Sequence, residues 1–169
     1  MKSIRFDVDD AALREEFLRT MMGEALASLQ PQEPPRWGAM AAQEMVEHLL
    51  WSVELSTGRA QADCPIPEEQ WGRMRAFLYK NAPMPHEFMN PLLTDGLPPL
   101  RYPGLPQATA ALEAEAKRFL EQAARGSAAT HQHPVFGPIG DEEWSRAHFK
   151  HGCHHLQQFG LIETVFPPR

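Results

Sequence analysis

Residues 141–160 read DEEWSRAHFKHGCHHLQQFG and carry four of the eight histidines of the chain. The three acidic residues at the start of this stretch complement the positive end of a helix dipole, so we expect a helix from Asp141 to about Phe159. Apolar residues recur along one side of that helix, and such a side must be buried against other elements. The stretch therefore predicts a core helix that packs into a larger helical unit.

Four further segments show helical periodicity or strong helical propensity, and no segment alternates with the period of two that a half-buried strand needs. These segments are residues 10–29, 39–57, 67–79 and 107–125. Residues 83–106 hold seven prolines and are expected to form a long, stiff, non-helical crossover of the kind that often walls a pocket. The predicted fold is all-α, a four-helix bundle with one accessory helix and a Pro-rich crossover, in a single domain of residues 1–169.

Composition narrows the function classes. The formal net charge of −6 and the lack of a Lys/Arg stripe argue against a nucleic-acid partner. No apolar run approaches the length of a membrane span, and the acidic N-terminal segment does not resemble a signal peptide, so a cytoplasmic protein is expected. Two cysteines far apart in the sequence suggest neither a disulfide framework nor a thiolate zinc site. Any metal ion must therefore be held by histidine.

The histidines of the last predicted helix differ in the side to which they point. At about 100° per residue, His148, His151 and His155 fall on the apolar side of the helix, whereas His154 is predicted to face solvent or a rim. An unpaired buried polar group costs roughly 1–3 kcal/mol, so three core-facing imidazoles need partners. A shared metal ion would satisfy all three, although hydrogen-bonded core histidines are the simpler alternative.

A ligand set can be proposed from the spacing. His151 and His155 are separated by four residues, which places both rings over the same turn of a helix, and His48 in the second predicted helix offers a third ligand. Three imidazoles with an open position are typical of a catalytic site, and zinc, nickel, iron or manganese would accept them. His148 could replace His151 as a ligand. His148 and Glu44 are also candidates to orient a ligand through a hydrogen bond or to act as a proton shuttle.

Other residues are weaker candidates. Trp51, Trp71 and Phe88 could line a substrate pocket, although aromatic residues at helical spacing are more often part of a core. Cys153 lies away from the histidine side of the last helix, so we expect it to pack in the core and not to act as a nucleophile.

Two stretches together resemble a known superfamily. PRWGAMAAQEMVEHLLW at residues 35–51 and HPVFGPIGDEEWSRAHFKHGCHHLQQFG at residues 133–160 are similar to the DinB-like superfamily of metal-dependent bundle proteins, and closest to a branch described only as a domain of unknown function. The resemblance implies a four-helix bundle, often dimeric, with one divalent metal ion held by three histidines at one end of a central cleft. Residue by residue, the matching positions are His48, His151 and His155.

Some members of this superfamily are thiol transferases that move a low-molecular-weight thiol onto an electrophile. The resemblance therefore implies a metal-dependent thiol transferase or hydrolase that acts on a small molecule such as a thiol, and it is compatible with a homodimer. A bundle without enzymatic activity, which binds a metal or a small ligand as a sensor or stress-response protein, is the alternative that the sequence leaves open.

Overall fold

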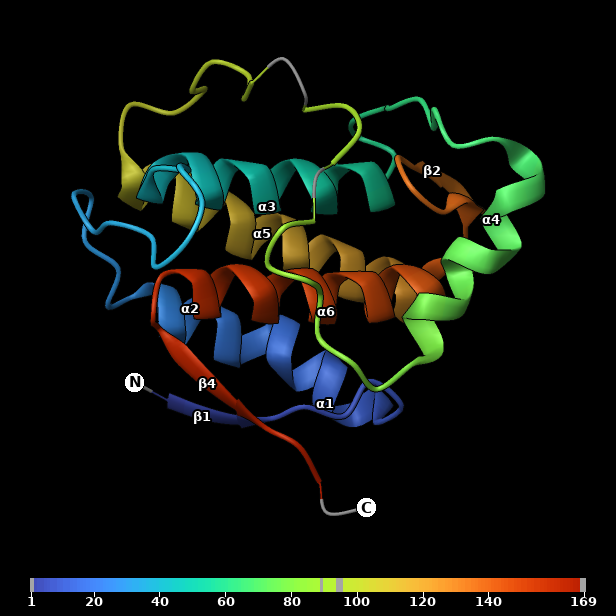
Figure 1. Ribbon diagram of the computed structural model, residues 1–169, viewed down its shortest axis with the longest axis horizontal. Helices are drawn as coiled ribbons and strands as arrows, with labels where there is room; N and C mark the ends of the chain where they lie inside the picture. The colour runs from blue at the N-terminus through green and yellow to red at the C-terminus, as the bar shows by residue number, and fades with distance from the viewer. Residues whose placement is uncertain (1, 89, 94–95, 168–169) are drawn as a thin grey trace.

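The computed structural model describes residues 2–88, 90–93 and 96–167, and it is mainly helical with two small sheets (Figure 1). The helical elements are α1 (Ala11–Glu16), the π-helical segment η1 (Phe17–Met21), α2 (Met22–Leu26), α3 (Ala42–Ser56), α4 (Glu68–Arg75), the 3₁₀ segment η2 (Ala76–Tyr79), α5 (Leu105–Ala124) and α6 (Asp141–Gln158). The strands are β1 (Lys2–Arg5), β2 (His131–His133), β3 (Gly137–Ile139) and β4 (Ile162–Val165).

All five predicted helical segments are present. α1, η1 and α2 follow one another without a break and form the first predicted helix, and α4 continues into η2. α5 begins at Leu105, two residues earlier than predicted, because Pro106 stands in the first turn, where a helix tolerates its missing N–H.

The prediction of a strictly all-α fold was wrong, because two short sheets were missed. β1 pairs in parallel with β4, Lys2 opposite Ile162, so that the two ends of the chain meet along one side of the bundle. β2 and β3 form an antiparallel hairpin in a segment that reads as turns. Strands of three or four residues are too short for an alternating pattern, and their pairing is set by partners distant in the chain.

Helices α3, α5, α6 and the α1–α2 segment surround the core. α5 turns Leu112, Ala116 and Phe119 inward at helical spacing and packs along α3. On α6, Trp144 and Phe149 are fully buried. The apolar side of each helix is thus covered by another helix, as the periodicity predicts. Within the described ranges, no helix is long and apolar enough to cross a membrane.

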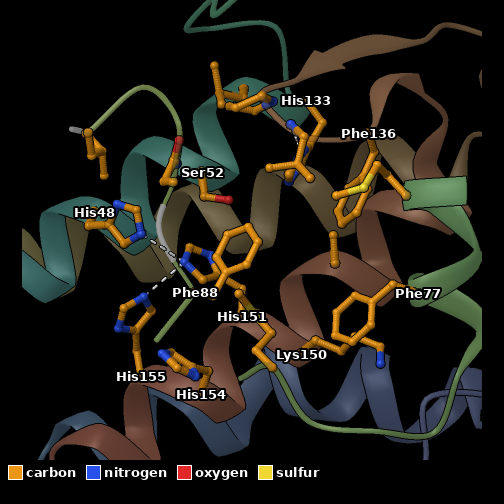
Figure 2. Close-up of a pocket in the computed structure, with 18 of the residues that line it drawn as sticks. His48, Ser52, Phe77, Phe88, His133, Phe136, Lys150, His151, His154 and His155 are labelled. Carbon is orange, nitrogen blue, oxygen red and sulfur yellow. Dashed lines mark hydrogen bonds between the residues drawn. The ribbon is translucent and has the colours of Figure 1, made fainter. Parts of the chain in front are cut away.

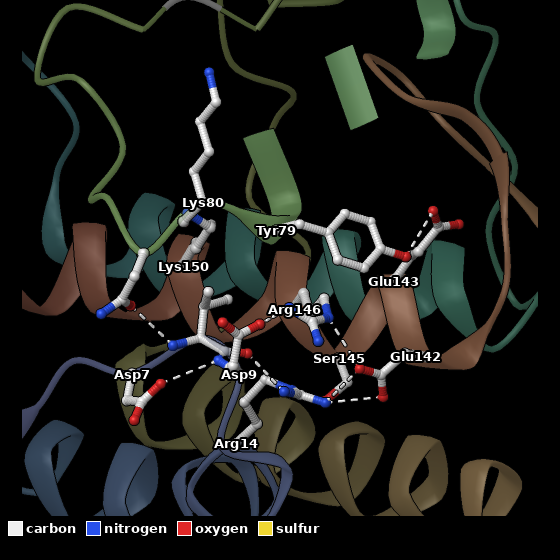
Figure 3. A network of polar contacts seen from close by, with 12 residues as sticks. Asp7, Asp9, Arg14, Tyr79, Lys80, Glu142, Glu143, Ser145, Arg146 and Lys150 are labelled. Atoms are coloured by element: carbon white, nitrogen blue, oxygen red, sulfur yellow. Dashed lines mark hydrogen bonds and ion pairs between the residues drawn. The ribbon is translucent and has the colours of Figure 1, made fainter. Parts of the chain in front are cut away.

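A buried arginine joins the first helix to the start of α6 (Figure 3). Arg14 is 1% exposed and donates hydrogen bonds to the Val8 carbonyl oxygen, the Ser145 hydroxyl and both carboxylate oxygens of Glu142. Arg146 also donates to Glu142. Because charge-assisted hydrogen bonds of this kind are geometrically specific, they hold the N-terminal turn of α6 against the first helix.

The Pro-rich crossover is fastened at both ends. Near its start, Lys150 of α6 donates from Nζ to the carbonyl oxygens of Lys80 and Ala82, at 2.5 and 2.6 Å. Near its end, the Glu47 carboxylate of α3 accepts a hydrogen bond from the Arg101 backbone N–H at 2.7 Å. The crossover is therefore held across α3 and α6, where it walls a cavity as predicted.

Candidate metal centre

Three histidines from two helices converge on one point (Figure 2). His48 lies on α3, and His151 and His155 lie one turn apart on α6. The Nε2 atom of His151 is 2.9 Å from Nε2 of His48 and 3.0 Å from Nε2 of His155, and one nitrogen from each ring lies within 4.8 Å of the other two. Together these residues form a three-histidine cluster that could hold a metal ion.

Two of the nitrogen–nitrogen separations are close to the spacing of two ligands on one cation. A ring nitrogen carries either one proton or one in-plane lone pair, so Nε2 of His151 cannot satisfy the other two Nε2 atoms at once. Two ligands on one ion, each at about 2.1 Å, stand about 3.0–3.4 Å apart when the angle between their bonds is about 90–109°. Of the two short separations, that of 3.0 Å lies at the lower edge of that range and that of 2.9 Å lies just below it.

Gln158 fixes the tautomer of His155 in which the lone pair of Nε2 is available to bind a metal ion. The Gln158 amide donates from Nε2 to the Trp37 carbonyl oxygen at 2.9 Å, so its Oε1 atom is the end that faces Nδ1 of His155, 2.8 Å away. The Nδ1–H group must therefore be the donor, and the lone pair is on Nε2. A hydrogen bond of this kind orients a ligand and raises its basicity. Gly38, at φ +75°, leaves room for the amide, because a Cβ atom there would stand 2.9 Å from Gln158 Nε2.

The three imidazoles are held in the neutral form that binds metal. Burial, together with the nearby His154, lowers the pKa of His48 to about 4. Burial and the neighbouring imidazoles also hold the pKa values of His151 and His155 well below the usual range. Protons therefore do not compete with a cation for these nitrogens near neutral pH.

His154 does not face solvent, which is one of the two positions that the helical wheel predicts; it lies in the wall of the cavity. Its side chain is buried, 9% exposed, and its ring packs edge-on against Trp37 with centroids 5.6 Å apart. Trp37 in turn stacks on His86 of the crossover, with centroids 3.8 Å apart and planes 6° from parallel. Loops that the wheel cannot represent cover this side of α6.

His148 and Glu44 form hydrogen bonds away from the cluster. His148 is buried beside Trp144, and its Nε2 atom lies 2.8 Å from the Ser56 hydroxyl. Burial lowers the pKa of His148 to about 3. Glu44 accepts a hydrogen bond from the Ala41 backbone N–H and caps α3. Of the two alternatives left open for the ligand set, the structure brings His151 and not His148 into the cluster. The shuttle roles of His148 and Glu44 stay predictions.

The cluster forms part of the wall of a cavity of about 460 Å³ (Figure 2). Trp51 and Phe88 line this cavity, as predicted. Trp71 lies elsewhere, where it donates to the Ile66 carbonyl oxygen and packs so closely on Gly137 that a Cβ atom there would stand 2.4 Å from the indole. The three-histidine cluster therefore opens onto a partly open cavity whose wall includes aromatic side chains.

Ser52 and Lys150 are polar residues of the cavity wall that the sequence did not identify. Ser52 follows His48 by one helical turn, and that spacing could have identified it. Lys150 reads as a surface charge in the sequence, but it is buried, and burial together with Arg146 lowers its pKa to about 8. Cys153 is 1% exposed and packs in the core as predicted, and burial raises the pKa of its thiol.

Part of the chain is similar to a described family. Residues 93–161 match the family model for DUF1569, a protein of unknown function. The DUF1569 match includes α5, the β2–β3 hairpin and α6, and therefore His151 and His155 but not His48. It agrees with the predicted branch of unknown function, while the wider DinB-like resemblance stays a prediction. Neither a curated protein nor a solved structure matches the chain.

Proposed function

We propose that this chain binds a divalent metal ion through His48, His151 and His155 and is a metal-dependent transferase or hydrolase for a small molecule. The observation that carries the proposal is the convergence of three neutral imidazoles at the wall of an apolar cavity. Among the residues that the structure describes, three supply ligands, and a three-ligand site keeps a position open, as catalytic sites do and structural sites do not. An ion there supplies Lewis-acid chemistry, which lowers the pKa of a thiol or of water.

The chain's own residues prepare the site in two ways. Gln158 holds His155 in one tautomer, and burial keeps all three rings neutral. The crossover places Met84, Phe88 and Leu93 over the cavity and so limits the access of water to the cluster. Excluding water strengthens electrostatic effects on a reacting group.

The DinB-like resemblance adds a low-molecular-weight thiol as the nucleophile to test. In the transfer reaction, a carbon–sulfur bond forms at an electrophilic carbon while the leaving group departs with its electron pair. The thiol proton is released to solvent. In hydrolysis, water takes the place of the thiol.

Metal analysis of protein purified without a histidine tag tests the site. We expect about one ion per chain after loading in the wild type and in His131→Ala, a matched control in β2, and much less in His48→Ala and His155→Ala. A wild-type content below about 0.1 ion per chain would contradict the proposal.

Turnover is tested with the loaded protein, the uncharged thiol 2-mercaptoethanol and 1-chloro-2,4-dinitrobenzene, in which chloride leaves as the thioether forms. We expect thioether formation in the wild type and in His131→Ala, and its loss in His48→Ala and His155→Ala. Full activity in the two ligand variants would remove the metal from the mechanism. Stoichiometric metal binding without turnover of any thiol or ester would favour a metal-binding sensor.

A further inference from the structure

We propose that the cavity binds an uncharged, mainly apolar molecule, and that the hydroxyl group of Ser52 positions the one polar group of that molecule beside the three-histidine cluster. This inference rests on the proposed function, since the cluster is the reacting end of the same cavity. It adds the chemical class of the substrate and a positioning residue.

The walls of the cavity are apolar and come from many parts of the chain. Side chains of α3, α4, η2, α6, the crossover and the segment after β2 all contribute. Apolar members of the lining include Met40, Trp51, Leu55, Met74, Phe77 and Phe88. A surface of this kind favours an apolar ligand, because burying apolar area is worth about 25 cal/mol per Å².

The wall offers little to pair with a charged ligand. The described lining contains no carboxylate. The Lys150 ammonium already donates to two carbonyl oxygens and lies 4.1 Å from the centre of the Phe77 ring. Arg73 is exposed and borders the cavity from α4. A charge brought into the cavity would therefore lose its hydration without gaining a buried partner.

Ser52 differs from Lys150 and Arg73 because its polar group is uncharged and lies on α3, one turn from His48. Its side chain is 7% exposed, and within the described ranges its hydroxyl has no hydrogen-bond partner. Figure 2 shows the hydroxyl oxygen directed into the cavity. Ser56, one turn further along α3, is different, since it donates to the Val53 carbonyl oxygen and contacts His148. The Ser52 hydroxyl is therefore available to form a hydrogen bond with a ligand in the cavity.

The position of Ser52 on α3 places a ligand bound to its hydroxyl beside the three-histidine cluster. His48 and Ser52 are separated by four residues on α3, so their side chains lie on the same side of the helix, about one turn apart. A hydroxyl both donates and accepts hydrogen bonds, so it can hold a hydroxyl, carbonyl or amide group. A ligand held there places its polar atoms next to the three imidazoles.

Three ligands that share one ring system test this inference on metal-free protein by fluorescence titration: naphthalene, 2-naphthol and 2-naphthoate. Wild-type protein should bind 2-naphthol more tightly than 2-naphthoate. Ser52→Ala should weaken the binding of 2-naphthol by about five- to tenfold, the value of one hydrogen bond, and should not weaken that of naphthalene. Ser28→Ala, an exposed serine remote from the cavity, is the matched control and should change neither.

Because Ala is a good helix former, Ser52→Ala should fold and should bind metal as the wild type does. Equal binding of 2-naphthol by the wild type and Ser52→Ala would overturn the role of Ser52. Failure of all three ligands to bind, or tighter binding of 2-naphthoate, would overturn the substrate class. His48→Ala should lose metal and keep 2-naphthol binding, so a failure of the metal site and a failure of this inference give different results.

Discussion

Replacement of Gly152 by alanine tests the packing that positions α6. Gly152 lies inside α6 next to His151, and its backbone conformation is ordinary for a helix. Alanine is favoured over glycine in a helix by about 0.5–1 kcal/mol, so helix propensity alone predicts that Gly152→Ala is stabilising. The tertiary structure predicts the opposite.

A Cβ atom at Gly152 would stand 2.6 Å from Cε1 and 2.8 Å from Cζ of Phe17. The Phe17 ring cannot move away easily, because it is fully buried and packs edge-on against Phe149 with centroids 5.2 Å apart. Overpacking of a buried site costs typically about 1–3 kcal/mol. After the gain in propensity is subtracted, Gly152→Ala should lower the free energy of unfolding by up to about 2 kcal/mol.

Gly72→Ala is the matched control, because Gly72 lies in α4 and a Cβ atom there meets nothing within 4 Å. Urea denaturation followed by circular dichroism should give free energies of unfolding that differ by about 1–3 kcal/mol between the two variants, with Gly72→Ala the more stable. Phe17→Leu should cost less in the Gly152→Ala background than in the wild type. If Gly152→Ala is as stabilising as Gly72→Ala, the close approach of α6 to η1 is wrong.

Three further predictions concern the metal site and its supports. Gln158→Leu removes the hydrogen-bond acceptor of His155 Nδ1, so it should weaken metal binding by about 10- to 100-fold in a competition titration with a chelator. Unchanged affinity would contradict the inference that Gln158 fixes the tautomer of His155. Burial lowers the pKa of His48 to about 4, so protons should compete with the metal ion only at low pH. Metal affinity should therefore stay nearly constant from neutral pH down to about pH 5 and fall below it, and a loss of affinity already at pH 6.5 would show that the ligands are exposed to solvent. Arg14→Met should lower the free energy of unfolding by about 2–3 kcal/mol, because it leaves the Val8 carbonyl oxygen and Ser145 without their donor. Glu142→Gln should lower it by less than about 1 kcal/mol, since Glu142 is largely exposed, and equal losses in urea denaturation would refute this ranking.

Much of the helical framework could be predicted because helix signals are local. The acidic first turn of α6, the propensity of α5 and the glycine after α5 act within a few residues of one another. The i, i+4 geometry that brings His151 and His155 together is likewise a property of a single helix. The third member of the cluster, His48, could be selected in advance because its stretch resembles a family pattern.

The short sheets could not be predicted in the same way. β1 and β4 lie at opposite ends of the sequence, and neither has enough residues for an alternating pattern. Their pairing exists because the bundle brings the two termini to the same side, which is a property of the whole fold.

The amino-acid sequence of this protein specifies where its helices lie and which histidines share a turn, since both follow from the 3.6-residue repeat. Only the tertiary structure specifies what covers each side of those helices. Packing of the loops buries His154, and a loop carbonyl orients Gln158 toward His155. Among the residues that the structure describes, none pairs with the Ser52 hydroxyl in the cavity. Burial and hydrogen bonding depend on residues distant in the chain, and they turn a row of histidines into a candidate metal centre.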